Sequence, residues 1–234
     1  AYDYADMTKQ AKSYYLKSVK IREQLKDTVG LMNTYNNLGI VYKNTGQLDS
    51  AIFFYERSLG LATRTGMSRY KINPLINLGV VYRQLNNNRK AISFYEQAKA
   101  ICIAENKEGQ LYTVNNNIGF LYNSLGEFSN ALPYTKGAAE FALQKGTLED
   151  MAEYLQNYAV SLNGLNRRRE AFDILLKSKV YTDSLYDAEN ARQMAELSAK
   201  YEDEKKANQI EILNQETAIQ KLQLRQRTIL FISA

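Results

Sequence analysis

The sequence predicts an all-α protein: a right-handed superhelical solenoid of stacked helical hairpins, followed by a long C-terminal helix. Three observations lead to this prediction. The chain of 234 residues has only two prolines and 12 glycines, and residues that favour helices occur throughout. Four sets of residues recur every 40 positions. The segment 187–227 contains neither glycine nor proline.

The period of 40 residues defines the hairpin. Glycine inside a helix costs about 1 kcal/mol relative to alanine. We therefore expect the series that begins with Gly39 to leave room for a second helix to pack closely, with the series that begins with Ala11 opposite it. The series that begins with Gly46 predicts the turn between the two helices, where a left-handed backbone suits glycine or asparagine. One hairpin cannot bury its own apolar face, so the hairpins must stack. The series are Gly39, Gly79, Gly119 and Ala159; Tyr2, Tyr42, Tyr82, Tyr122 and Leu162; Ala11, Ala51, Ala91, Ala131 and Ala171; and Gly46, Asn86, Gly126 and Asn166.

The order of these residues (a large residue, Leu-Gly, Tyr, then Ala and an aromatic) resembles the tetratricopeptide repeat. The family's usual period is about 34 residues, and the 40-residue period resembles the long-repeat subgroup that includes kinesin light chain. A period of 40 residues implies longer helices or longer links between repeats. The resemblance covers 1–186, with a partial repeat at 1–28, whose first helix is expected to begin before residue 1, and then four repeats.

The composition argues against catalysis and metal binding. The chain has no histidine and one cysteine, so a Ser-His-Asp or Cys-His arrangement cannot form and the commonest metal ligands are missing. We therefore expect a non-enzymatic chain with no metal and no cofactor. Cys102 aligns with Ala62 and Ala142, which predicts a small core residue.

A column of asparagines is predicted on the concave face, which the first helix of each hairpin lines. Asparagine is unfavourable inside helices, but its amide both donates and accepts hydrogen bonds, which suits the backbone of a protein or extended peptide partner. The resemblance to kinesin light chain-like repeats implies the same role for Asn37, Asn77, Asn117 and Asn157. The alternative is that these amides bond to the adjacent repeat and fix the stack. The predicted partner-binding residues are Asn33, Asn36, Asn37, Asn73, Asn77, Asn116, Asn117, Asn157, Lys43 and Arg83.

The residues beside this column indicate the ligand chemistry. The position after the small-residue series is apolar and does not match the two-lysine carboxylate clamp of chaperone-binding repeats, so a free C-terminal carboxylate is not the expected ligand. Lys43 and Arg83 would favour an acidic segment, or they are solvated rim residues. The tyrosines are assigned to the core, so we expect no binding of nucleic acid.

The C-terminal part departs from the repeat. Apolar and polar residues at spacings of three and four within 187–227 predict a weak coiled coil and a homodimer, or a single exposed helix. The apolar residues 228–234 are expected to begin a transmembrane helix, although seven residues cannot span a bilayer. The alternatives are a buried turn or a dimer contact.

This tail resembles a family of bacterial membrane-bound regulators, which carry a repeat domain, one membrane helix and an output domain. The resemblance implies a periplasmic sensor domain anchored in the inner membrane. A histidine kinase or LuxR-type DNA-binding output would lie beyond residue 234. The second hypothesis is a cytoplasmic adaptor or scaffold.

Overall fold

The computed structural model describes the backbone of residues 2–232 and the side chains of residues 8–215 and 217. These residues form helices and turns without a strand. The chain divides into two compact units, Ala1–Tyr181 and Thr182–Ala234, and each is treated by itself. The helices are α1 (Tyr2–Gln24), α2 (Thr28–Asn44), α3 (Leu48–Arg64), the 3-10 helix η1 (Ser68–Lys71), α4 (Ile72–Gln84), α5 (Asn88–Ala104), α6 (Glu108–Ser124), α7 (Phe128–Lys145), α8 (Leu148–Gly164) and α9 (Arg168–Ile232).

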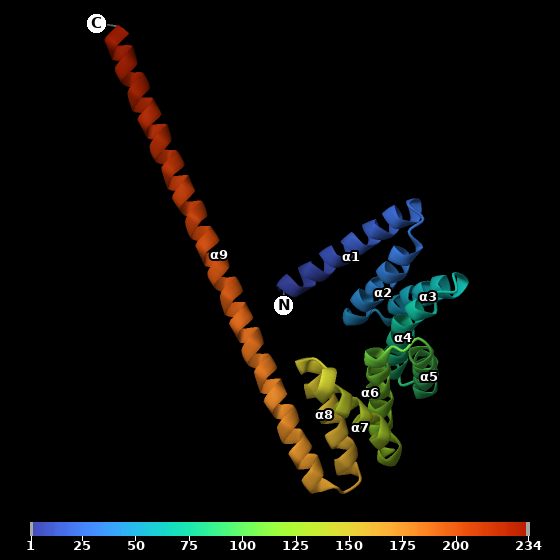
Figure 1. Ribbon diagram of the computed structural model, residues 1–234. Coiled ribbons are helices and arrows are strands. Elements are labelled where there is room, and N and C mark those ends of the chain that lie inside the picture. Colours follow the sequence, from blue (N-terminus) through green and yellow to red (C-terminus); the bar gives the residue numbers. More distant parts are fainter. Residues whose placement is uncertain (1, 233–234) are drawn as a thin grey trace. The chain divides into compact units, whose positions relative to one another are not determined.

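The first unit is a stack of helical hairpins, as the sequence predicts. Helices α2 and α3, α4 and α5, and α6 and α7 pair in order, and α1 packs on α2 (Figure 1). The first helices of the hairpins also contact one another, α2 with α4, α4 with α6 and α6 with α8. They therefore form one layer of the array, which is where a solenoid places its concave binding surface.

Long helices account for the 40-residue period. Helices α2 and α3 have 17 residues each, and a turn of three residues follows each of them, within the hairpin at 45–47 and between hairpins at 65–67. Of the two options that the period left open, longer helices or longer links, the structure shows the first.

The predicted turn series is confirmed. Gly46, Asn86, Gly126 and Asn166 have φ angles of 74°, 56°, 75° and 62°. A second left-handed series between hairpins was not anticipated: Lys26, Gly66 and Asn106 have φ angles of 54°, 68° and 53°. Its next member, Gly146, has φ −80°, and α8 instead begins with a capping box between Thr147 and Asp150.

Proline reshapes the start of the second hairpin. Residues 68–71 form the 3-10 helix η1, whereas the equivalent residues 28–31 and 108–111 are α-helical. Pro74 has no N–H to donate to the carbonyl of Tyr70, and its ring would clash with that carbonyl in an α-helix. The α-helix α4 therefore begins only at Ile72.

At Gly39 and Gly79 the small-residue series faces aromatic rings, and at Gly119 it faces the side chain of Thr135, which corrects the expectation that it faces the alanine series. A Cβ atom on Gly39 would lie 2.5 Å from Cδ1 of Tyr55, and one on Gly79 would lie 2.6 Å from Cδ1 of Tyr95. Both tyrosines are fully buried. The alanines from Ala51 onward are buried as well, but the ring is what needs the room that glycine leaves.

Helix α9 begins at Arg168, so the predicted helix over 187–227 is part of a longer one. Its first turns close the array: Ser178 donates a hydrogen bond of 2.7 Å to the carbonyl of Ala152. In the second unit the apolar side chains Met194, Leu197, Tyr201 and Ile210 are exposed, and the coiled coil and homodimer stay predictions. Within the described residues, no helix combines the length and apolarity that crossing a membrane requires. The side chains of 228–234, the predicted start of a membrane helix, lie outside the described residues.

Candidate peptide-binding groove

The asparagine column forms a ladder between repeats at two steps. The side-chain amide of Asn77 donates to Oδ1 of Asn36 at 3.0 Å, and that of Asn157 donates to Oδ1 of Asn116 at 2.8 Å. Each bond joins one hairpin to the next. Between them the ladder is interrupted, because Ile76 stands where an amide partner would be and Asn117 donates instead to the carbonyl of Thr113 in its own helix, at 3.0 Å.

The C-terminal end of this ladder is buried and fully engaged. Asn116 and Asn157 are 2% and 7% exposed. The amide of Asn116 donates to Oε1 of Glu153 at 2.7 Å. Asn123 donates to the carbonyl of Asn157 at 2.9 Å and accepts from Ser161 at 2.9 Å. These amides hold α6 against α8, which is the role that the alternative hypothesis assigned to the column.

The N-terminal end of the column remains open. Asn33 and Asn73 are exposed, and Asn37 is half-buried. Within the described part of the chain, the amides of Asn33 and Asn37 make no hydrogen bond, and Asn73 accepts only a long one of 3.5 Å from Gln110. These amide groups are available to a ligand.

A cavity of about 220 Å³, here called the basic cavity, gathers three of the predicted residues, Asn33, Asn36 and Asn73. It is built from three successive hairpins. Its basic residues, Arg69 and Lys107, are not predicted from the sequence, because neither belongs to a repeating series. The remaining lining residues are Met32, Ser58, Tyr70, Pro74 and Gln110.

The two predicted basic residues lie outside this cavity. The guanidinium carbon of Arg83 is 4.3 Å from the centroid of the Phe120 ring. Its Nε is buried and has no hydrogen-bond partner in the described residues. Lys43 is half-buried near the end of α2. The structure therefore places Lys43 and Arg83 outside the cavity that Asn33 and Asn73 line.

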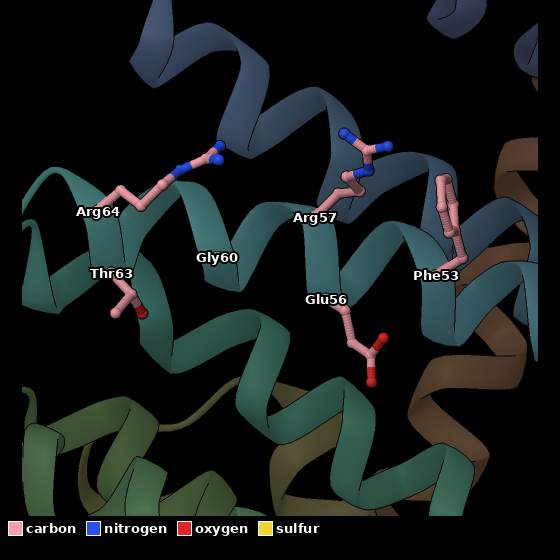
Figure 2. Close-up of a pocket in the computed structure, with 6 residues that line it drawn as sticks. All are labelled: Phe53, Glu56, Arg57, Gly60, Thr63 and Arg64. Atoms are coloured by element: carbon pink, nitrogen blue, oxygen red, sulfur yellow. The ribbon is translucent and has the colours of Figure 1, made fainter.

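A hollow of about 580 Å³ on α3 has a different character (Figure 2). Figure 2 shows the side chains of Phe53, Arg57 and Arg64 on one side of α3 and those of Glu56 and Thr63 on the other, with Gly60 between them. All of its lining residues come from one helix, so it is an open face rather than an enclosed site. None of the predicted site residues lies there.

Cys102 has the environment of a core residue. It is 1% exposed, and burial raises the pKa of its thiol to about 11. The thiol is therefore protonated at neutral pH and is a poor nucleophile. Among the described residues there is no group of three or more Cys, Asp or Glu side chains placed to hold a metal ion.

The fold and its open amides define a class of protein: a helical-hairpin solenoid with a polar groove on its first helices. Sequence comparison identifies the repeat. The Tetratricopeptide repeat family matches residues 1–64 and 30–104, so this part of the chain contains tetratricopeptide repeats, as the residue pattern predicted. No curated protein sequence matches the chain significantly.

Solved structures with the same fold extend the match beyond residue 104. BtubC (BKLC) from P. vanneervenii is 20% identical with a TM-score of 0.69, over 79% of this chain and 76% of that one. A putative kinesin light chain from Podosopora anserina is 16% identical with a TM-score of 0.59, over 79% and 91%. The Rap conjugation gene regulator of plasmid pLS20, solved with the Phr* peptide, is 13% identical with a TM-score of 0.63, over 79% and 52%. This chain thus spans about half of Rap's length. At these identities the likeness establishes the fold.

Proposed function

We propose that this chain is a non-catalytic domain that binds an extended peptide, or an extended segment of a protein, along the open end of its asparagine column. One observation carries the proposal. The amides of Asn116 and Asn157 are buried and bonded to each other, whereas those of Asn33, Asn37 and Asn73 are accessible and lack strong partners. Amides in a helix interior that do not stabilise the stack need another role. A peptide backbone offers the donors and acceptors that they match.

The fold supports this choice of ligand. Tetratricopeptide arrays present a continuous surface built from successive first helices, which suits an extended chain. The Rap regulator, which has a similar fold, was solved with a peptide. Its identity to this chain is low, so it suggests the ligand class and not the binding residues.

A peptide selection tests the proposal. A random-sequence display library would be selected on the immobilised chain, and the affinity of an enriched peptide would be measured by fluorescence anisotropy. We expect the double substitution Asn37→Ala and Asn73→Ala to weaken binding roughly tenfold, the loss of one or two hydrogen bonds. The matched control is Gln97→Ala, because Gln97 is exposed on α5 and, among the described residues, bonds only to Ser93 of its own helix. Unchanged affinity with an intact helical signal would refute the role of the column.

We also propose that the domain is the periplasmic sensor of a membrane-bound regulator of the histidine kinase type. This rests on the tail, where a helix with exposed apolar side chains leads to the apolar residues 228–234. The parent gene provides the first test. A membrane-spanning segment and an output domain beyond Ala234 would support the sensor, and a stop codon there would favour the adaptor. An alkaline phosphatase fusion, active only outside the cytoplasm, would test the periplasmic location.

A further inference from the structure

We propose that the basic cavity binds the carboxylate side chain of an acidic residue in the peptide ligand. This inference rests on the proposed function and adds to it the chemistry of one ligand position. The volume of about 220 Å³ is below the roughly 300–1,000 Å³ of sites that hold a whole small molecule. It fits one side chain.

The charge of the cavity selects an anion. Among the described residues, Arg69 and Lys107 are the only charged ones that line it, and no carboxylate does. Within the described part of the chain, neither forms an ion pair. Asn33, Asn36 and Gln110 place amide groups beside them. Hydrogen bonds from charged donors to a carboxylate are about twice as strong as neutral ones, so an acidic side chain is the matching occupant.

The arginine is held in place before any ligand arrives. Its Nη2 donates to the hydroxyl of Tyr70 at 3.1 Å, and its guanidinium carbon lies 4.9 Å from the centroid of the Tyr70 ring. Both residues belong to η1, the 3-10 turn that precedes Pro74. A side chain that is already ordered loses less entropy on binding. The turn thus places an ordered cation at a position that Val29, Gly109 and Glu149 occupy in the other hairpins.

The equivalent position one repeat later provides a natural contrast. A hollow of about 450 Å³ lies there, and its charged lining residues are two cations, Lys145 and the Lys107 that it shares with the basic cavity, and two anions, Glu108 and Asp150. Gly109 stands where Arg69 does in the basic cavity, and Asp150 where Gln110 does. Lys145 forms an ion pair with Glu108 at 2.7 Å. Charges are balanced within this hollow, so the preference for an anion is specific to the basic cavity.

The experiment uses the peptides selected on the full chain, prepared with an amidated C-terminus so that any carboxylate signal comes from a side chain. We expect an Asp or Glu at one fixed position of the selected peptides. Replacing it with Asn or Gln should weaken binding about tenfold, the loss of a charged hydrogen bond. The double variant Arg69→Met and Lys107→Met should bind the acidic and amide peptides equally. Lys145→Met, the matched control, should retain the tenfold preference.

The outcomes separate the two proposals. If peptides are enriched and bind but carry no acidic position, or if the Arg69→Met and Lys107→Met variant keeps the preference, the carboxylate inference is wrong while peptide binding stands. If no peptide is enriched, both fail. Circular dichroism of each variant identifies a loss of fold, and in that case the single variant Lys107→Met should still reduce the preference.

Discussion

The contact between Gly79 and Tyr95 allows a sharp test of how the hairpins close. A Cβ atom on Gly79 would lie 2.6 Å from Cδ1 and 2.8 Å from Cζ of the Tyr95 ring. Tyr95 is 0% exposed, so its ring cannot swing into solvent. In Gly79→Ala, the ring or the helix backbone must shift by roughly 1 Å to restore ordinary contact, because Cε1 of the ring lies closer still and packed interiors leave no free volume.

Two opposing effects set how much Gly79→Ala changes the free energy of unfolding. Overpacking a buried site costs about 1–3 kcal/mol, and a contact that involves several ring atoms belongs at the upper end. Alanine returns about 1 kcal/mol of helix propensity. We therefore expect Gly79→Ala to lower the free energy of unfolding by about 2 kcal/mol. Gly60, in the interior of α3, supplies the control because a Cβ there meets nothing within 4 Å. Gly60→Ala should stabilise the chain by about 1 kcal/mol.

Urea unfolding followed by circular dichroism measures both variants. A double-mutant cycle with Tyr95→Leu isolates the contact, because the fourth hairpin has Ala159 and Leu175 at the two equivalent positions. The cycle should give a favourable coupling of about 2 kcal/mol between the two substitutions. If Gly79→Ala proves as stable as Gly60→Ala, or if the two changes are additive, glycine is not there to admit the ring.

Three further predictions concern buried polar groups. Asn115→Leu should raise the free energy of unfolding by about 1 kcal/mol in urea titrations, because Oδ1 of Asn115 is buried without a partner among the described residues and an unsatisfied group is costly; a decrease in the free energy of unfolding would contradict this. Burial raises the pKa of Tyr95 to about 12 from 10.0, and the nearby Arg83 offsets only part of that rise. The contribution of Tyr95 to the free energy of unfolding is therefore complete below pH 10 and is lost as the pH rises towards 12, at about 1.4 kcal/mol per pH unit. Tyr95→Phe should reduce that loss when urea midpoints are compared across this range. Asn157→Ala should destabilise the chain by about 1–3 kcal/mol, since it leaves the buried Asn116 without its donor, whereas Asn37→Ala should leave the thermal midpoint nearly unchanged.

The asparagine column shows where inference from sequence stops. Its residues and their spacing are visible in the repeat, and the structure confirms that they lie on successive first helices. Which amides are engaged depends on the residue one hairpin earlier: Asn36 accepts from Asn77, but Ile76 offers nothing to Asn117. A hydrogen bond between hairpins requires two particular side chains at the right separation, and no single repeat contains that information.

The sequence by itself determined the solenoid, its period and its turn residues, because these follow from local preferences that recur every 40 positions. Left-handed turns at Gly46 and Asn86 are an example. Only the tertiary structure decided that glycine faces a tyrosine ring, and that Arg69 and Lys107 share a cavity with three of the asparagines. The physical reason is the same in both cases. These contacts join residues from different helices or different hairpins, so they depend on how the helices pack and not on the pattern within one repeat.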